Sequence, residues 1–360
     1  MPSDNQIIIA AAGSGKTTAI INDACQDTAR TAALITYTIN GRNELRKKAF
    51  ELYGAIPPHV TIMTWYNFLL RHCVRPYQNL LDTHGFRTTG INFIRGRSAR
   101  GIPATNVRGH YFTRSGNIHL DKVSKFACNV NQHTDGKPLA RIEAIFDRIF
   151  IDESQDLAGW DLELVELFLH SNIQTNLVGD HRQATYSTND SGKNSKYFGV
   201  KIIDRFSEWE KADIANIIHH NYSYRCVQAI CDLADGFHPV SETTESYNGN
   251  TSEHDGAFAV LKKDIPIYLS RYSPQVLRYS RATKNLPGHP MNFGQSKGMT
   301  FNRTLIFPHG KLKKYLNTGD INDAGNALSL IYVAITRARQ SVGFVVENNY
   351  QEGVLPIFTP

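Results

Sequence analysis

The sequence predicts an α/β protein with two tandem domains, in which parallel sheets are covered by helices on both faces. Three observations lead to this class. The chain has 360 residues, which suits two domains of ordinary size. Short apolar runs that end in polar loops recur along it, with helical stretches between them. The chain opens with a strand, a glycine-rich turn and a helix, the order that a phosphate-binding loop requires.

The apolar runs mark the expected strands. These are Ile7 to Ala10, Ala32 to Thr36, Ile149 to Ile151, Asn176 to Val178, Thr304 to Phe307 and Val342 to Val346. Two segments interrupt the pattern, because 87–121 is rich in Gly, Arg, Asn and Thr, and 240–256 is polar and reads as a mobile loop. We therefore expect a first domain built from residues 1–73 and 145–205, a small insertion at 74–144, and a second domain at 206–360.

Charge is concentrated in the expected insertion. Between Val74 and Arg141 there are eleven Lys and Arg residues against three Asp (Asp82, Asp121, Asp135). This segment alone therefore has a net charge of +8, whereas the whole chain has a net charge of +6, so the rest of the chain is slightly acidic. Such a cluster favours a phosphate backbone or another polyanion as partner, although a solvated basic surface is the alternative. We expect no membrane contact and a cytoplasmic location, because no apolar run approaches the roughly 18 residues of a spanning helix. The five scattered cysteines read as ordinary thiols.

The segment AAAGSGKTT, from Ala10 to Thr18, has the composition of a phosphate-binding loop. Small residues allow backbone amides to wrap a phosphate, Lys16 can reach the outer phosphates, and the Thr17 hydroxyl can hold Mg²⁺. The alternative, a glycine-rich turn that binds nothing, leaves the lysine and threonine unexplained. ATP and Mg²⁺ are the expected cofactors, and the expected nucleotide-binding residues here are Ala12, Gly13, Ser14, Gly15, Lys16, Thr17 and Thr18.

A second chemical signature lies in IFIDESQD, from Ile149 to Asp156, where an apolar strand ends in adjacent carboxylates. Asp152 at the strand tip can bind Mg²⁺ through water, and Glu153 can orient and deprotonate an attacking water. Two acids at a strand end can also cap a helix. Because the chain also contains a phosphate-binding loop upstream, we favour the catalytic interpretation.

With the remaining motifs added, the sequence resembles the UvrD/Rep-like superfamily 1 (1A) DNA helicases in a compact form. The similar segments follow the order of that family along nearly the whole chain. They are Thr36 to Leu45 (motif Ia), Thr64 to Arg71 (Ib), Gly179 to Tyr186 (III), Tyr224 to Ile230 (IV), Gly294 to Phe301 (V) and Tyr332 to Arg339 (VI). The resemblance implies that both domains are RecA-like.

The resemblance also implies roles for individual residues. Gln183 would sense the γ-phosphate, Arg225 and Arg337 would act as arginine fingers, and Tyr224 would stack on the base of the nucleotide. The nucleic-acid-binding residues that it implies are Tyr37, Thr38, Trp65, Tyr66 and Lys297. A core packing role is the alternative for Trp65 and Tyr37.

Several positions depart from the pattern of the family. Only nine residues precede Ala10, too few for the upstream glutamine motif that reads adenine, and Thr18 and Thr300 stand where relatives have an arginine and a glutamate. Ser187, Thr188 and Asn189 follow motif III, where relatives offer a tryptophan that stacks on DNA. The short stretch between Arg225 and Met291 leaves no room for the large helical insertion of bigger relatives.

The implied function is an ATP-dependent single-stranded DNA translocase or helicase with 3′ to 5′ direction, which hydrolyses ATP at the interface of two RecA-like domains. Its implied partner is single-stranded DNA, including a duplex with a 3′ tail. The alternative is a nucleotide- and DNA-responsive subunit that switches a partner nuclease in antiviral defence, similar to the helicase-like component of Gabija-type systems. A kinase or transporter ATPase would leave motifs III to VI without a role.

Overall fold

The computed structural model describes residues 4–80, 87–94, 96–351 and 353–360, so Asp82 and Arg95 of the basic segment lie outside the described residues. The chain divides into two compact units. The first contains Met1–Ile9 and Lys16–His219, and the second contains Ala10–Gly15 and His220–Pro360. The helices of the described residues are all too short or too polar to cross a membrane.

A six-stranded sheet forms the centre of the first unit, in the order β3-β2-β6-β7-β1-β8. The pairs β3/β2, β2/β6, β6/β7 and β7/β1 are parallel. The strands are β1 (Gln6–Ala10), β2 (Ala32–Thr36), β3 (Val60–Thr64), β6 (Arg148–Asp152), β7 (Gln174–Gly179) and β8 (Asn216–His220). Four of these contain or coincide with apolar runs that the sequence marked as strands.

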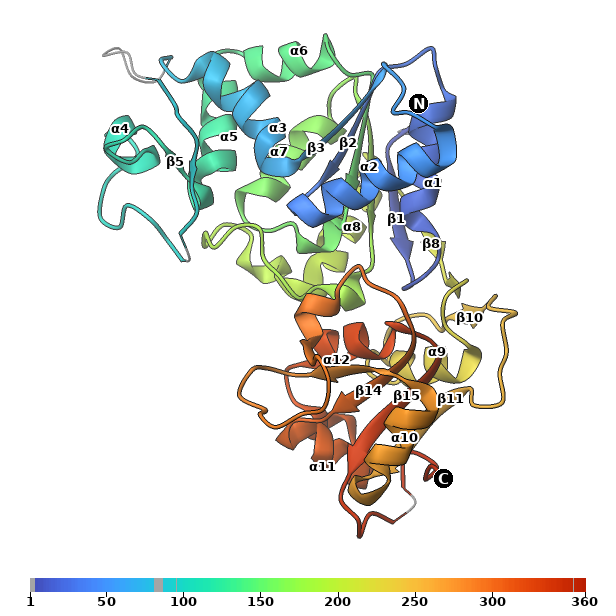
Figure 1. Cartoon of the computed structure of the whole chain (residues 1–360). Helices are drawn as coiled ribbons and strands as arrows, with labels where there is room; N and C mark the ends of the chain where they lie inside the picture. Colours follow the sequence, from blue (N-terminus) through green and yellow to red (C-terminus); the bar gives the residue numbers. More distant parts are fainter. Residues whose placement is uncertain (1–3, 81–86, 95, 352) are drawn as a thin grey trace. The chain divides into compact units, whose positions relative to one another are not determined.

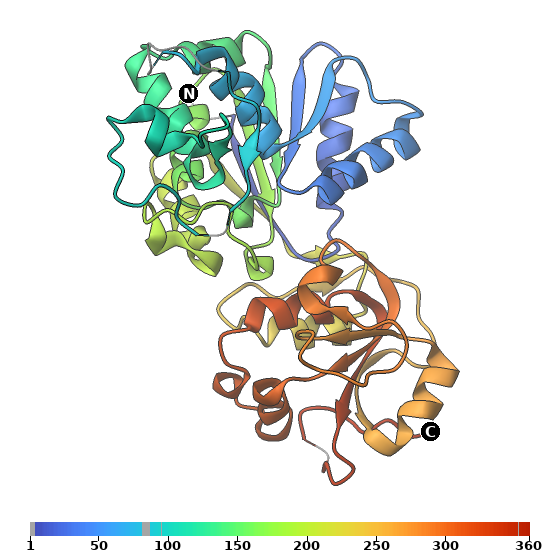
Figure 2. The same cartoon turned by 60° about the vertical axis from the view of Figure 1, so that its left-hand side comes forward.

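Alternate residues of each strand face opposite sides of this sheet. Ile8 and Leu34 pack against helices α1 and α2, whereas Ile7, Ile9 and Ile35 pack into the larger core formed with α3, α5, α7 and α8. Figures 1 and 2 show these helices on the two faces. The helices of this unit are α1 (Lys16–Gln26), α2 (Ile39–Tyr53), α3 (Trp65–Leu69), α4 (Val107–Tyr111), α5 (Val123–His133), α6 (Lys137–Glu143), α7 (Trp160–Leu169) and α8 (Ile202–Lys211).

Shorter elements connect these layers. In the first unit, β4 (Ile91–Asn92) pairs with β5 (Ile118–His119). The single helical turns of the chain are η1 (Leu70–Val74), which is π-helical, and the 3₁₀ turns η2 (Arg75–Tyr77), η3 (Leu120–Lys122), η4 (Ser154–Asp156), η5 (His181–Gln183), η6 (Ser195–Tyr197), η7 (Gly199–Lys201), η8 (Lys262–Asp264), η9 (Phe293–Ser296) and η10 (Ile321–Ala324).

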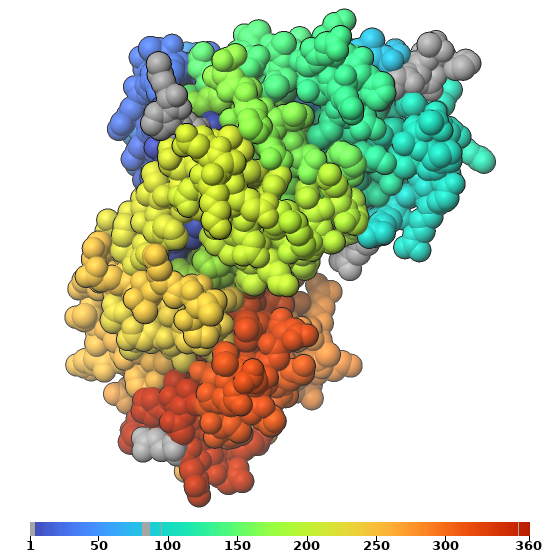
Figure 3. All heavy atoms as spheres, turned by 180° about the vertical axis from the view of Figure 1, so that it is seen from behind, coloured from blue at the N-terminus to red at the C-terminus, as the bar shows by residue number. Residues whose placement is uncertain are grey.

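The basic segment 74–144 is only in part a surface insertion. Residues around 90–120 gather on one flank of the first unit (Figure 3), where β4, α4 and β5 lie. Helices α5 and α6 instead bury Val123, Phe126, Val130 and Ile142 in the same core as the central sheet. The expectation of a separate insertion is therefore corrected for its second half, because the apolar stripe of α5 completes the first core.

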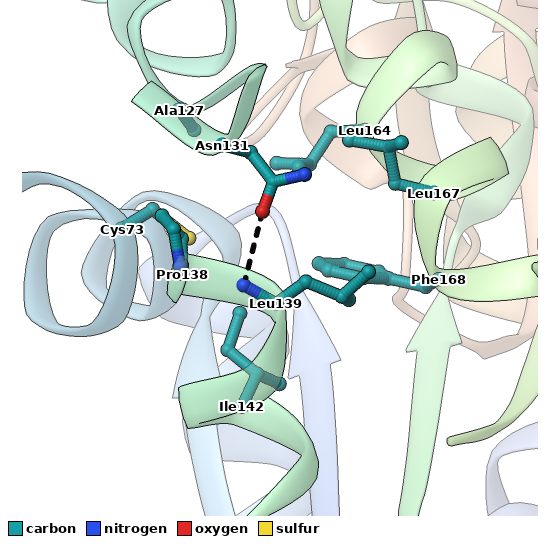
Figure 4. Close-up of a pocket in the computed structure, with 9 residues that line it drawn as sticks. All are labelled: Cys73, Ala127, Asn131, Pro138, Leu139, Ile142, Leu164, Leu167 and Phe168. Atoms are coloured by element: carbon teal, nitrogen blue, oxygen red, sulfur yellow. Dashed lines mark hydrogen bonds between the residues drawn. The ribbon is translucent and has the colours of Figure 1, made fainter. Parts of the chain in front are cut away.

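Figure 4 shows how closely α5 and α6 are integrated. Asn131 of α5 accepts a hydrogen bond from the backbone N–H of Leu139 in α6 (3.1 Å), and Phe168 of α7 lies opposite. The cavity between them has a volume of about 10 Å³, room for no more than one water molecule. This region is core and offers no ligand site.

The second unit contains a five-stranded parallel sheet in the order β11-β15-β14-β12-β13. Its strands are β11 (Gly256–Leu261), β12 (Gln275–Arg278), β13 (Met291–Asn292), β14 (Phe301–Phe307) and β15 (Ala338–Val346). Helix α10 (Ile265–Tyr272) packs on one face, and α9 (Gln228–Asp235), α11 (Gly310–Thr318) and α12 (Leu328–Ile335) pack on the other. Both sheets thus have helices on both faces, which confirms the predicted α/β class.

The boundary between the units lies later than the sequence suggested. We expected the second domain to begin at residue 206, but α8 and β8 complete the first unit. The physical reason is that α8 buries Ile202, Phe206 and Trp209 in the first core.

The polar segment 240–256, expected as a mobile loop, is tied to the second unit. Its short strand β10 (Glu245–Ser246) pairs in parallel with β9 (Tyr222–Ser223). Its end is held by His254, whose imidazole stacks between the rings of Phe258 and Tyr272 with centroids 4.1 and 4.0 Å away. Side-chain hydrogen bonds and ring stacking therefore order a stretch whose composition indicated only polarity.

Candidate functional site

The turn after β1 has the backbone of a phosphate-binding loop. Gly13 and Gly15 have φ values of 82° and 83°, in the left-handed region that side chains disfavour, and the N–H of Ser14 donates to the carbonyl of Ala11. Helix α1 begins directly afterwards at Lys16, with Thr17 and Thr18 in its first turn. The backbone N–H groups of the loop are thus followed directly in the chain by a helix N-terminus, the order of a phosphate-binding loop.

Motif IV holds this loop within the second unit. The Ser223 hydroxyl donates to the carbonyl of Ala12 (2.7 Å), and the N–H of Tyr224 donates to the carbonyl of Gly13 (3.0 Å). A Cβ at Gly13 would come within 2.5 Å of the Cβ of Arg225, so only glycine fits this position. The ring of Tyr224 lies 3.9 Å from the place of a Cβ at Gly15 and is 58% exposed, which suits a stacking partner for a base.

The side chains around the loop fit a nucleotide with a divalent cation. The Ser14 hydroxyl is buried and has no hydrogen-bond partner among the described residues, as expected for a group that a ligand satisfies. The Thr17 hydroxyl lies 3.4 Å from Oδ2 of Asp152, so the two Mg²⁺ candidates are adjacent. Both supply oxygen atoms, the ligands that Mg²⁺ prefers.

Without a bound cation, the surroundings of Asp152 disfavour its charged form. Burial and the neighbouring charge of Glu153 together raise the pKa of Asp152 to about 6, although the charge of Lys16 lowers it. A divalent cation would relieve this carboxylate. The arrangement thus favours metal binding at Asp152.

Glu153 is held in a left-handed conformation at the strand end (φ 59°), and its N–H donates to Oδ1 of Asp152 (3.0 Å). The Gln155 amide donates to the Glu153 carboxylate, which orients it. A non-glycine residue with positive φ is rare outside turns and functional sites. The left-handed backbone of Glu153 therefore ends the strand directly after Asp152.

Gln155 connects this acid pair to motif III, a link that the sequence analysis missed. Its side-chain oxygen accepts a hydrogen bond from the N–H of Asp180 (3.1 Å), while its side-chain nitrogen donates one to the carboxylate of Glu153. A Cβ on Gly179 would clash with Gln155, so the glycine is required for this approach. Spacing alone gave no signal for Gln155, because a glutamine two residues after an acid has no distinctive pattern.

Asp180 is the second residue that the sequence analysis missed. Its carboxylate accepts from Nε of Arg182 (3.1 Å) and from Nε2 of Gln183 (2.9 Å). Burial would raise its pKa, but the charges of Arg182 and Lys16 and the Gln183 hydrogen bond hold the pKa well below its usual range. Asp180 thus positions the expected γ-phosphate sensor Gln183 and remains charged.

The two expected arginine fingers lie close together within the second unit. Arg225 donates to the carbonyl of Thr336 (3.1 Å). Arg337 is only 2% exposed and donates to the carbonyls of Val333 (3.0 Å) and Met299 (3.2 Å). In this conformation the guanidinium of Arg337 therefore links motif VI to motif V through backbone carbonyls.

Trp65 does not have the exposure that a stacking platform needs. It is 0% exposed, its ring lies parallel to Phe68, and its Nε1 donates to the buried carboxylate of Asp161 (3.1 Å). The expectation of a nucleic-acid contact is corrected for this residue: it is part of the core, because its indole completes a buried polar contact as well as an apolar one.

The other expected nucleic-acid residues are more accessible. Thr38 is exposed, but its hydroxyl also caps α2 by accepting from the N–H of Gly41 (2.9 Å). Tyr66 is half-buried, with its hydroxyl donating to the carbonyl of Thr188 (2.6 Å). Tyr37 is half-buried with an enclosed hydroxyl, and Lys297 is half-buried beside motif V. Thr38 and Tyr66 thus remain the best placed of the set.

Two exposed rings near these residues were not singled out from the sequence. Phe93 is 71% exposed and packs edge to face against Tyr66, with centroids 6.2 Å apart. Its segment is fixed to the region after motif III, since Gly96 N–H and Arg97 Nε donate to Asp190. Tyr186, at the end of motif III, is 53% exposed. A Phe in an irregular basic segment carries no periodic signal, so only the structure reveals its exposure.

Residues 69–193 match the family model of the UvrD/REP helicase N-terminal domain. Within this UvrD-like match lie Asp152, Glu153, Gln155, Asp180 and Gln183, together with the basic segment. No curated protein matches the chain.

Three of the solved structures that are similar to this chain are of viral helicases. They are the PRRSV helicase (18% identity, TM-score 0.47), arterivirus nonstructural protein 10, a helicase (16%, 0.47), and a complex of arterivirus nonstructural protein 10 with DNA (15%, 0.48). Each match covers 96% of this chain but only 53%, 60% and 61% of the respective viral chain. The chain thus spans less than two thirds of the length of these helicases.

Proposed function

We propose that this protein is an ATP-dependent translocase or helicase that acts on single-stranded DNA in the 3′ to 5′ direction. One observation carries the proposal. The buried chain Glu153, Gln155, Asp180 and Gln183 joins the acid pair to motif III by hydrogen bonds inside a UvrD-like domain. Such a chain can couple the state of a phosphate to a neighbouring surface, which a motor requires and a simple nucleotide-binding protein does not.

Each side chain then has a chemical task. Lys16 contacts the outer phosphates, Thr17 and Asp152 hold Mg²⁺, and Glu153 orients a water molecule and accepts its proton. Bound Mg²⁺ supplies charge neutralisation on the phosphates. Gln183, positioned by Asp180, responds to the γ-phosphate, while Tyr224 stacks on the base.

The nucleic-acid surface in this proposal follows the carboxyl ends of β2 and β3. Thr38 and Tyr66 lie directly after these strands, and Phe93 adds an exposed ring beside Tyr66. Aromatic stacking with backbone contacts is the usual manner of binding a single strand without sequence preference.

The test measures ATP hydrolysis with and without oligo(dT). We expect stimulation by the single strand, and Glu153→Gln should lower turnover about 10² to 10⁴-fold while ATP binding is retained. Lys16→Ala, which removes a phosphate contact, is the control in which ATP binding itself weakens. Binding of ATP without strand-stimulated turnover would contradict the motor and favour the nucleotide-responsive regulatory subunit.

A further inference from the structure

The open edge of the first sheet borders a basic groove that the proposed motor function does not use. Strand β3 is the last strand of the sheet order, so its outer edge has no partner strand among the described residues. Beside it lies a groove of about 640 Å³. The ten residues that line it come from β3, α2, α3 and the turns around them: Arg46, Ile56, Val60, Thr61, Ile62, Met63, Asn67, Leu70, Arg71 and Arg75.

The backbone of β3 can accept another strand along this edge. His59 directs its carbonyl toward β2, where it accepts from the N–H of Ala32 (2.9 Å). Because successive residues of a strand direct their backbone groups to opposite sides, Ile62 directs its N–H and carbonyl to the outer edge. An exposed sheet edge of this kind is a template for an added strand.

The charge of the groove is of one sign. Arg46, Arg71 and Arg75 are exposed, and none of the lining residues is Asp or Glu. None of the three forms an ion pair with a described residue, and only Arg75 has a hydrogen bond, from its guanidinium to the carbonyl of Thr89 (3.1 Å). The π-helical turn η1 brings Arg71 to the rim, and such turns are frequent at functional sites.

The lining favours a peptide over a nucleic acid. Ile56 and Ile62 lie on one face of the sheet and Met63 and Leu70 on the other, so alternate side chains of an added extended segment would meet apolar residues on each face. The lining contains no aromatic ring on which a base could stack. One end of the groove, lined by Asn67, Leu70 and Arg71, follows β3 as Tyr66 does, so oligo(dT) is the competing ligand that the experiment must include.

We propose that this groove docks an extended acidic segment of a partner protein, which adds to the edge of β3 and pairs its carboxylates with Arg46, Arg71 and Arg75. The segment has alternating apolar and acidic residues. Its affinity comes from backbone hydrogen bonds and from the apolar residues on the two faces, and its selectivity comes from the arginines. This inference does not depend on ATP hydrolysis.

The experiment measures fluorescence anisotropy of three labelled probes with the full chain: a decapeptide of alternating Glu and Val, its counterpart of alternating Lys and Val, and ten-residue oligo(dT). We expect the acidic peptide to bind and the basic one to bind at least about tenfold more weakly. An acidic peptide N-methylated at alternate residues should also bind poorly, because methylation removes the hydrogen bonds to the strand edge.

The key variant is Arg71→Glu with Arg75→Glu, which should weaken the acidic peptide by about tenfold or more. The matched control is Lys201→Glu with Lys211→Glu, at exposed positions at the two ends of α8, which changes the net charge equally and should have no effect. The proposal is overturned if the acidic peptide does not bind, if both double variants weaken it alike, or if the arginine variant weakens only oligo(dT). The last result would assign the groove to nucleic acid.

Discussion

At the scale of single residues, Arg337 shows how a residue assigned to catalysis can also be part of the fold. Its guanidinium contacts the carbonyls of Val333 and Met299 and the hydroxyl of Thr336 (3.3 Å), all within the second unit. To act on a phosphate it must exchange at least part of these bonds. Lysine cannot reproduce this fork of donors, so Arg337→Lys is not a conservative change here.

We therefore expect Arg337→Ala to lower ATP turnover on the order of 10³-fold or more. Because three hydrogen bonds donated by Arg337 are lost, the melting temperature should fall as well. Steady-state ATPase assays and thermal unfolding of Arg337→Ala and Arg337→Lys test this together. Normal turnover in Arg337→Ala would remove the assigned role, and a loss of turnover in Arg337→Lys at unchanged melting temperature would assign that loss to the phosphate contact.

A second residue-scale prediction concerns His254, which lies between two aromatic rings. Burial and the charges of Arg303 and Arg271 lower its pKa to about 4. In the unfolded chain the pKa is near 6.5, so between pH 6.5 and 4 the unfolded state binds a proton that the folded state excludes. The stability that the neutral imidazole contributes is therefore present above pH 6.5 and is lost as the pH falls to 4.

The expected size of this loss is about 1 to 3 kcal/mol in the free energy of unfolding. Urea unfolding of the protein and of His254→Phe, at pH 7 and pH 4.5, gives the measurement. The phenylalanine can occupy the stack but cannot titrate, so its loss of stability on acidification should be smaller. Equal losses in both proteins would show that other groups cause the pH dependence.

At the scale of elements, the sequence predicted what periodicity and motif spacing can encode. Strands β1, β2, β6 and β7 and the loop before α1 appear where apolar runs and glycines indicated. It did not predict the place of α8 or α5, because an amphipathic helix specifies that it packs but not on which core. Likewise Trp65 looked like a platform, since its sequence context is the same whether its indole faces a strand of DNA or Asp161.

The irregular basic segment yields the element-scale prediction. Phe93 follows β4 and holds an exposed ring against Tyr66, so Phe93→Ala should weaken binding of oligo(dT) by about 5 to 100-fold. The affinity for ATP and the melting temperature should not change, because the side chain is largely exposed. The matched control is Phe50→Ala on α2, which is 62% exposed but belongs to another surface. If Phe93→Ala weakens oligo(dT) binding no more than Phe50→Ala does, the ring of Phe93 does not contact the strand.

At the scale of the whole molecule, the stretch between Arg225 and Met291 is used entirely for the second unit itself. It forms α9, β10, β11, α10 and β12, which are parts of that unit or of the short β9–β10 pair. A subdomain that grips duplex DNA therefore has no residues available in this stretch. After motif III, Thr188 is buried and bonded to Ala158 and Tyr66, so it offers no wedge to a duplex.

These features lead to the last prediction, that the protein moves along a single strand but separates duplexes weakly when it acts alone. ATP-driven changes at Gln183 and Asp180 can move a strand held by Thr38, Tyr66 and Phe93, whereas strand separation also needs a surface that holds the duplex. We would measure single-turnover unwinding of duplexes with a 3′ or a 5′ tail, with and without excess protein. Translocation is measured separately, by displacement of streptavidin from biotinylated oligo(dT). We expect displacement from the 3′ to the 5′ end, little unwinding by monomers, and more unwinding when several copies load on one 3′ tail. Efficient unwinding by isolated monomers, or a preference for the 5′ tail, would contradict this prediction. If ATP is hydrolysed but streptavidin is not displaced, hydrolysis drives a regulatory switch instead of movement along the strand.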